Sequence, residues 1–265
     1  MSWFLTSILT LTLSGTPPAT VAPAPAATAT PADINNVDEL LDAVNASDAK
    51  IKTLRTTIRY ETVQALLDDT QVRKGTAVLS ISPDRRLKQF RVSFTQYISG
   101  RGLESQARDY IFDGRYLVER LNDEKQFIKR EVVRPGQEID PLAIDGPLPL
   151  PIGQSKEMIL KRFTAAMLEC EADEKDRLKG HYRMRLTARN KDDDLETVDL
   201  WYDPLTLLPG RALITQRGGD TVRVDLVHTT INDAEVDAAQ FSTESPSLAD
   251  GWRIDIRPLE DVKGP

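Results

Sequence analysis

The chain has 265 residues, of which 40% are hydrophobic and 28% charged, and its formal net charge is −7. This length and apolar content suffice to bury a sizeable core, in one large domain or two small ones. Nucleic-acid binding requires a concentrated basic surface, so the acidic balance argues against nucleic acid as a partner. The short basic runs alternate with apolar residues, and we interpret them as the solvated faces of strands.

The N-terminal segment differs in composition from the rest of the chain. An apolar run from Trp3 to Leu13, too short to span a bilayer as a helix, is followed by an Ala-, Pro- and Thr-rich stretch with small-residue sites at 24–26 and 27–29. This order is typical of a secretory signal peptide over residues 1–29, followed by a flexible tail over 30–36. We therefore expect cleavage between Ala27 and Thr30 and a periplasmic mature protein.

The folded domain is expected over residues 37–258, with a C-terminal tail at 259–265. Its first element is a helix over about 37–49, because Val37, Leu40, Leu41 and Val44 fall at helical spacing behind Asn36, a favourable N-cap residue. Glu39 stands where a capping-box acid reaches back to the start of the helix.

From residue 54 onward the apolar period changes from 3.6 to 2, which predicts consecutive antiparallel strands. Turns are expected at Pro83-Asp84, Asp113-Gly114, Asn122-Asp123, Asp203–Thr206 and Arg217–Asp220, where Pro, Gly, Asn and Asp cluster. The residues predicted to share apolar faces are Leu54, Ile58 and Tyr60; Ala77, Leu79 and Ile81; Phe90, Val92 and Phe94; Val198, Leu200 and Tyr202; and Val222, Val224 and Leu226.

A proline-rich loop over 134–155 carries more leucine and isoleucine than a solvated loop needs, which indicates that it lies over apolar surface. Ser155 then caps a predicted second helix, whose apolar stripe consists of Ile159, Phe163, Ala166, Met167 and Cys170. The stripe is compatible with two roles, as core packed on the sheet or as the lid of a cavity. Cys170, the only cysteine of the chain, is interpreted as a small core residue.

No catalytic signature for an acyl, metal, nucleotide or dinucleotide enzyme is recognisable, so we expect neither enzymatic activity nor a cofactor. The triplet Asp192–Asp194 is interpreted as a hairpin turn rather than a metal site, because metal ligands must converge from several positions. Roughly ten or eleven strands and two main helices without βαβ alternation favour a mainly β fold with α. The expected fold is a curved antiparallel sheet forming a half-open β-barrel, covered by the helices and the proline-rich loop.

Four segments, taken in order, resemble the LolA-like family of periplasmic lipoprotein carriers. They are "GTAVLSISPDRRLKQFRV", "YIFDGRYLVER", "LWYDPLTLLPGRALI" and the closing "INDAEVDAAQFSTESPSLADGWRI", of which the last is the most specific. The resemblance runs from about Val37 to Ile254. It implies a monomeric, non-enzymatic chaperone that holds lipoprotein acyl chains or other lipid in a hydrophobic cavity. It also implies two partners, an inner-membrane release complex and an outer-membrane acceptor.

The family carries an Arg before the Pro of its "RP" motif, where it latches the lid. Here that position is Ser82, and Arg85 and Arg86 are the candidate replacements for the latch. The predicted cavity lining is Leu79, Ile81, Phe90, Val92, Phe94, Val222, Val224 and Leu226, with Ile159, Phe163 and Met167 as the lid.

Three hypotheses are compatible with this architecture. The first is a lipid or lipoprotein carrier, and the second is a regulatory domain that senses lipid or protein without delivering it. The third is a structural module whose interior is filled by its own side chains. Fold similarity alone does not decide among them.

Overall fold

The first folded element is the amphipathic helix α1, Val37–Asp48, which begins where its sequence predicts and ends one residue earlier. The computed structural model describes residues 33–83, 87–134, 152, 155–169, 177–233 and 236–259. Asn36 caps the helix by accepting a hydrogen bond from Glu39 N at 2.9 Å. The Glu39 carboxylate reaches back one residue further than predicted and accepts from Asn35 N.

The strands and remaining helices follow in sequence order. They are β1 (Thr53–Gln64), the 3-10 turn η1 (Ala65–Leu67), β2 (Asp69–Ile81), β3 (Lys88–Ser99), β4 (Gly102–Phe112), β5 (Tyr116–Leu121), β6 (Gln126–Glu131), α2 (Lys156–Arg162), β7 (Phe163–Leu168), β8 (Tyr182–Ala188), β9 (Leu195–Tyr202), β10 (Pro209–Gln216), β11 (Thr221–Ile231), the 3-10 turns η2 (Ala238–Phe241) and η3 (Leu248–Asp250), and β12 (Arg253–Arg257).

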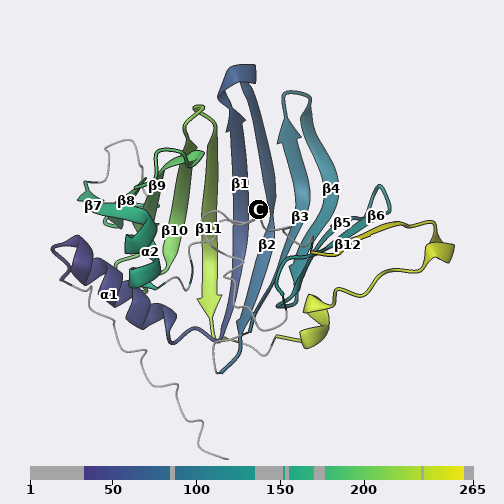
Figure 1. Ribbon diagram of the computed structural model, residues 1–265, viewed down its shortest axis with the longest axis horizontal. Coiled ribbons are helices and arrows are strands. Elements are labelled where there is room, and N and C mark those ends of the chain that lie inside the picture. Colours follow the sequence, from purple (N-terminus) through teal and green to yellow (C-terminus); the bar gives the residue numbers. More distant parts are fainter. Residues whose placement is uncertain are drawn as a thin grey trace, which may run out of the picture. The chain divides into compact units, whose positions relative to one another are not determined.

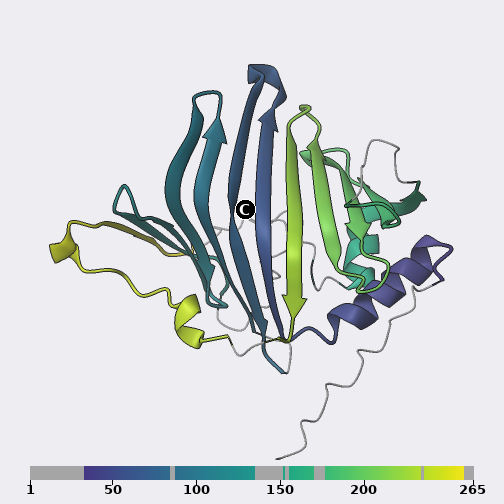
Figure 2. The ribbon, with the colours of Figure 1, turned by 180° about the vertical axis from the view of Figure 1, so that it is seen from behind.

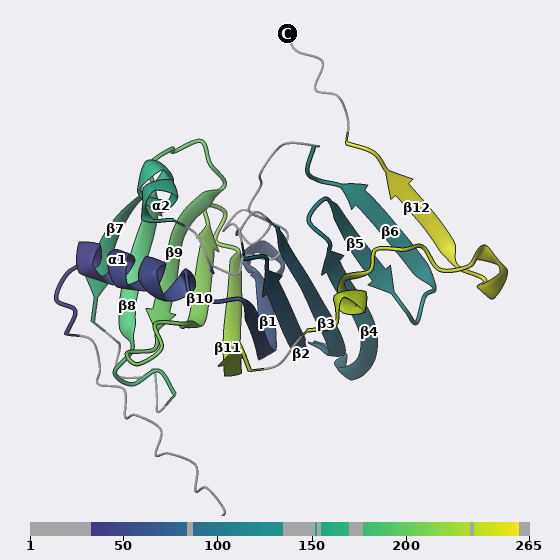
Figure 3. The ribbon, with the colours of Figure 1, turned by 90° about the horizontal axis from the view of Figure 1, so that it is seen from below.

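All twelve strands of the described chain belong to one sheet with the order β12-β6-β5-β4-β3-β2-β1-β11-β10-β9-β8-β7. Figures 1 and 2 show β1, β2 and β11 at its centre, with α1 and α2 beside β7–β10. Seen from below, the sheet is an arc whose two outer groups of strands rise on the same side (Figure 3). Neighbouring strands are antiparallel except for β12, which runs parallel to β6. The expected mainly β fold, a curved antiparallel sheet forming a half-open barrel, is confirmed, and the sheet does not close.

The second helix is shorter than predicted. It ends at Arg162, and the chain continues from Phe163 as strand β7, with Phe163 paired to Ala188 and Leu168 to Arg183 of β8. The prediction of a helical stripe reaching Met167 is therefore wrong. An apolar residue at 163, 165 and 167 fits the period of a strand as well as that of a helix, and pairing with β8 decides between them.

Several sequence predictions lie outside the described residues. These are the signal peptide, residues 30–32 of the tail that follows it, Asp84, Arg85 and Arg86, Cys170, most of the proline-rich loop, and the tail beyond residue 259. Within the part of the chain that is described, no helix is long and apolar enough to cross a membrane.

A bulge in β3 bends the sheet close to its centre. Between Phe94 and Gln96 one residue is left unpaired against both β2 and β4. Bulges increase strand bending and twist, and they need room for displaced backbone. Gly75 of β2 supplies that room, because a Cβ at this position would lie 1.9 Å from Ser93 O.

Gly75→Ala should therefore destabilise the protein, although its glycine lies inside a strand where alanine is normally preferred. Overpacking typically costs about 1–3 kcal/mol, and contact with backbone rather than side chain places the expected loss at or above the upper end. Gly100→Ala is the matched control, since nothing lies within 4 Å of a Cβ there. Chemical unfolding of both variants tests this, and equal stability of the two would contradict the role given to the bulge.

Candidate functional site

The concave face of the sheet carries the largest apolar cluster among the described residues. Its buried members come from both halves of the sheet and from α1 and α2. The eleven residues predicted to line a cavity all belong to it or pack against it. Leu79, Ile81, Phe90, Val92, Phe94, Ile159, Phe163, Val224 and Leu226 are buried, whereas Met167 and Val222 are partly buried.

Strand register places these side chains on one face. Alternate residues of β2 and β3 meet as direct neighbours, with Leu79 opposite Phe90 and Ala77 opposite Val92. Phe90 also stacks on Phe112 of β4, with ring centroids 5.6 Å apart. The face continues through β1 into β11, so it is one surface rather than two separate cores.

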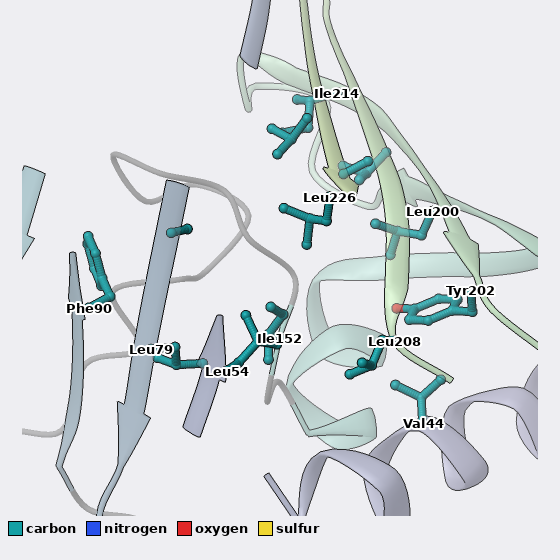
Figure 4. Packing of buried hydrophobic residues seen from close by; sticks show 14 of the residues in the cluster. Val44, Leu54, Leu79, Phe90, Ile152, Leu200, Tyr202, Leu208, Ile214 and Leu226 are labelled. Carbon is teal, nitrogen blue, oxygen red and sulfur yellow. The ribbon is translucent and has the colours of Figure 1, made fainter. Parts of the chain in front are cut away.

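Ile152 is the most unusual member of this cluster. It comes from neither strand nor helix, yet only 1% of its surface is exposed. In Figure 4 it lies between Leu54 of β1 on one side and Leu226 and Leu208 on the other. The sequence indicated that the loop over 134–155 lies over apolar surface, and Ile152 fulfils that expectation for this residue.

The junction between α2 and β7 holds the residues predicted as a lid. Ser155 accepts a hydrogen bond from Met158 N and caps the start of α2. At the other end Arg189 Nε donates to Leu160 O and Phe163 O, both at 3.0 Å. The helix is thus fixed at both ends, and Phe163 is held against the concave face by the sheet rather than by a mobile helix.

Toward the Arg73 end of β2, the concave face carries aromatic rings in contact with one another and with arginine. Phe94 lies between Tyr60 and Tyr110, with ring centroids 6.1 and 6.2 Å away. Arg73 stands over the ring of Tyr97, 5.0 Å from its centroid. We call Tyr60, Arg73, Phe94, Tyr97, Arg108 and Tyr110 the tyrosine–arginine end. The sequence predicted Phe94 as a lining residue and Tyr60 on an apolar face, but it gave Arg73, Tyr97, Arg108 and Tyr110 no role, although alternation along β2 places Arg73 on the face of Leu79.

Burial raises the pKa of Tyr60, and Tyr110 adds to the rise while Arg73 opposes it. Burial is also the main reason that the pKa of Tyr110 is raised, followed by the charge of Glu119. Both hydroxyls therefore remain protonated at neutral pH. Tyr110 donates its proton to Glu119 at 3.2 Å, whereas Tyr60 has no hydrogen-bond partner among the described residues.

A small cavity of about 50 Å³ opens at the ends of β1 and β11, lined by Thr53, Leu54, Arg55, Thr230, Asp233 and Val236. It has room for about three to five water molecules, and most of its lining residues are polar. An acyl chain does not fit there. On the concave face itself the apolar residues are already buried, so a ligand of that face has to take the place of groups that cover it.

The convex face has the opposite character. Asp199 is buried and held by Arg183 at 2.7 Å and Arg185 at 2.6 Å. Asp225, also buried, is held by Arg177 at 2.6 Å and Arg211 at 2.7 Å. Breaking such an ion pair leaves a buried charge without a partner and costs about 3–5 kcal/mol. These ion pairs therefore hold neighbouring strands together in the β8–β11 half of the sheet.

Of the candidate latch region, the structure describes Ser82 but not Arg85 or Arg86. Ser82, which stands where the family carries Arg, closes the β2–β3 turn: its hydroxyl accepts from Leu87 N at 3.0 Å and its N–H donates to Leu87 O. The residue thus has a local role in the hairpin. Across the described ranges, no group of three or more His, Cys, Asp or Glu residues could hold a metal ion, and Asp192–Asp194 lie in the predicted turn.

An open, largely antiparallel sheet with an apolar concave face and a polar convex face is the class of architecture that these observations define. No family model and no curated protein matches the sequence. Among solved structures, the complex of MucA and MucB from Pseudomonas aeruginosa matches at TM-score 0.44 and 12% identity over 77% of this chain. This chain spans 60% of the length of the chain it matches there.

Two further solved structures are similar. A putative outer membrane lipoprotein-sorting protein domain from Vibrio parahaemolyticus matches at TM-score 0.38 and 11% identity, over 76% of this chain and 94% of that one. A LolA superfamily protein from Nitrosomonas europaea matches at TM-score 0.32 and 12% identity, over 79% and 98%. The chain is thus similar to these folds at low identity, and its function has to be argued from its own residues.

Phe163 offers a test of how tightly the concave face is packed. Phe163→Ala should lower the free energy of unfolding by about 3–5 kcal/mol if neighbours enclose the ring completely. Met167→Ala, on the same edge strand but partly exposed, should cost less. Denaturant titration of both variants measures the difference. A Phe163→Ala loss no larger than that of Met167→Ala would show that the ring borders open space.

Proposed function

We propose that the protein is a non-enzymatic lipid carrier whose concave face binds the acyl chains of lipoproteins, or of another lipid, for transport across the periplasm to the outer membrane. The observation that carries the proposal is Ile152. An isoleucine from outside the sheet and helices fills the centre of the apolar face, between Leu54 and Leu226. We infer that Ile152 occupies the place of an acyl chain and is displaced by it.

The magnitudes favour this exchange. Burying a CH₂ group is worth about 0.8 kcal/mol, so a chain of some fifteen methylenes gains roughly 12 kcal/mol on leaving water. Exposing one isoleucine side chain costs about 1.5–3 kcal/mol. An acyl chain therefore outcompetes Ile152 even after much of its gain is spent on ordering and on moving other groups. The sequence resemblance to LolA-like carriers supports the same ligand class.

The open side of the sheet supports the proposal as well. Because β7 and β12 form open edges, no strand of the described chain builds a far wall across the concave side. In the carrier, Arg85 and Arg86 are the proposed latch of the lid. The carrier's proposed partners are an inner-membrane release complex and an outer-membrane acceptor.

The alternative is a regulatory domain that senses lipid or protein through the same face. The two roles share the binding step and differ in the step after it. A carrier transfers its ligand to an acceptor membrane, whereas a sensor changes its affinity for a signalling protein when lipid binds. Transfer of a labelled lipid from the purified protein to acceptor vesicles distinguishes them.

Replacing Ile152 by Ala should tighten acyl-chain binding, because the internal competitor is weakened. We expect up to about a tenfold gain in affinity, which corresponds to about 1.4 kcal/mol. Titration with a fluorescent fatty acid measures it. Ile111→Ala is the matched control: Ile111 is 4% exposed but belongs to the small cluster on the convex face. It should lose stability without any change in acyl affinity.

Two outcomes would contradict this. Unchanged or weaker binding by Ile152→Ala would show that Ile152 does not occupy the position of the ligand. Absence of acyl binding by both the wild type and the variant would show that the concave face is only core, and the carrier proposal would fall.

The proposed transport requires export. A signal peptide over residues 1–29 predicts that the mature protein begins between Ala27 and Thr30. N-terminal sequencing of protein purified from its native periplasmic fraction should find one of these residues first. Detection of Met1 or Ser2 on protein confined to the cytoplasm would exclude the proposed location.

A further inference from the structure

Arg73 lies on the concave face without a counter-ion among the described residues. Within those ranges it forms no ion pair, and its buried Nε atom has no hydrogen-bond acceptor. Glu104, which lies opposite Tyr97 in register, is exposed and makes no ion pair with Arg73. A partly buried guanidinium with unused donors is a ready site for an oxyanion.

The neighbourhood is positively charged. Arg108 and Arg130 share a single carboxylate, that of Glu119, at 3.6 and 3.8 Å. The Nε atom of Arg108 is buried and also lacks an acceptor among the described residues. Arg73, Arg108 and Arg130 thus share this part of the concave side with two glutamates, the paired Glu119 and the exposed Glu104, which makes no ion pair with Arg73.

The tyrosine–arginine end adjoins the apolar face directly. Arg73 and Leu79 point to the same side of β2, because residues an even number apart share a face. Gly75 and Ala77 are the only residues between them on that side. No long side chain of β2 therefore separates the arginine from the apolar cluster, and six residues correspond to about 20 Å along the strand.

We infer that the tyrosine–arginine end binds the anionic head group of the acyl ligand, with Arg73 as the principal contact. The Arg73 guanidinium donates to the oxyanion, and the Tyr60 hydroxyl, a protonated donor, lies beside it. The ligand class is an amphiphile that combines one or more acyl chains with a carboxylate or phosphate, rather than a neutral lipid. The inference rests on the proposed function, since a head group reaches Arg73 only if its chain lies on the neighbouring face.

A matched pair of lipids tests this. A monoacylglycerol and its phosphate ester with the same acyl chain are compared by displacement of a fluorescent fatty-acyl probe. The wild type should bind the phosphate ester about tenfold more tightly, as expected for charge-assisted hydrogen bonds. Arg73→Gln should abolish this preference and leave the affinity for the neutral lipid unchanged, and Arg73→Lys should restore part of it.

Arg55→Gln is the control for the loss of one positive charge, because Arg55 is exposed on β1 and its odd position places it on the opposite face from Tyr60. It should keep the full preference. If Arg73→Gln does not fold, the wild type alone tests the inference. Raising the salt concentration should then weaken binding of the phosphate ester and leave binding of the neutral lipid unchanged. A salt-independent preference would overturn the inference.

The remaining outcomes separate the two proposals. Equal binding of both lipids by the wild type would overturn the inference about the head group but not the proposal that the concave face binds acyl chains. Binding of neither lipid would overturn both. Inorganic phosphate alone should show no saturable binding in calorimetry at millimolar concentration; binding as tight as that of the lipid phosphate would assign the site to free phosphate instead.

Discussion

The constraint on which this structure depends is that an open sheet has to cover its apolar concave face. In a closed barrel the opposite wall does so, but here β7 and β12 remain edges and the arc is unclosed. Helices α1 and α2 pack near β7, and Ile152 fills the centre of the arc. Among the described residues, the cover thus consists of small pieces that are not part of the sheet. In the proposed carrier, such pieces would be exchanged for the ligand without breaking strand pairing.

The convex face determines which side becomes apolar. In the strands β8–β11, buried aspartates alternate with the inward apolar residues and are held by arginines of neighbouring strands. Asp199 lies between Leu200 and Val198, and Asp225 between Val224 and Leu226. A slip of one residue would carry these charges into the core, and such a slip is therefore strongly disfavoured. The Asp–Arg ion pairs of the convex face consequently stabilise the strand register that places the apolar residues on the concave face. In the other half of the sheet, Trp252 and Ile254 pack against a smaller apolar cluster. Ile254 belongs to β12, which pairs with β6 at this edge.

The parts of this fold that depend on local pattern are predictable from the sequence. Helix α1 and its Asn36 cap, the hairpin turns and the apolar faces of β2, β3 and β11 follow from spacing and turn chemistry. The strand conformation that begins at Phe163 does not, because its neighbours satisfy both periods and pairing with β8 is a long-range event. Strand β12 was missed for a similar reason: five residues gain their strand character from parallel pairing with β6. The candidate site shows the same division. Eight of the eleven lining residues could be named from strand alternation, and Ile159, Phe163 and Met167 from a helical spacing that holds only as far as Arg162. The tyrosines and arginines of the tyrosine–arginine end could not be grouped in this way, because the tyrosines belong to three strands and only register brings them to Arg73. Ile152 lies between these cases, since its loop is recognisable as too apolar for solvent, but no local rule states which of its residues is buried.

In the proposed carrier, Ile152 and Arg73 would control different properties of binding, the affinity for the acyl chain and the choice of head group. A gain of about 12 kcal/mol on burying a long chain would correspond to nanomolar affinity if nothing opposed it, and a carrier so tight would release its ligand slowly. An internal competitor reduces the apparent affinity to the intrinsic affinity multiplied by the fraction of molecules whose face is vacant, and it does so equally for every acyl ligand. In the proposed mechanism Arg73 contacts only the head group, so it would change which ligand binds without changing how the face is vacated. Return of Ile152 would then assist release of any chain, whereas loss of the oxyanion contact would be required only for the ligand that the arginine selects.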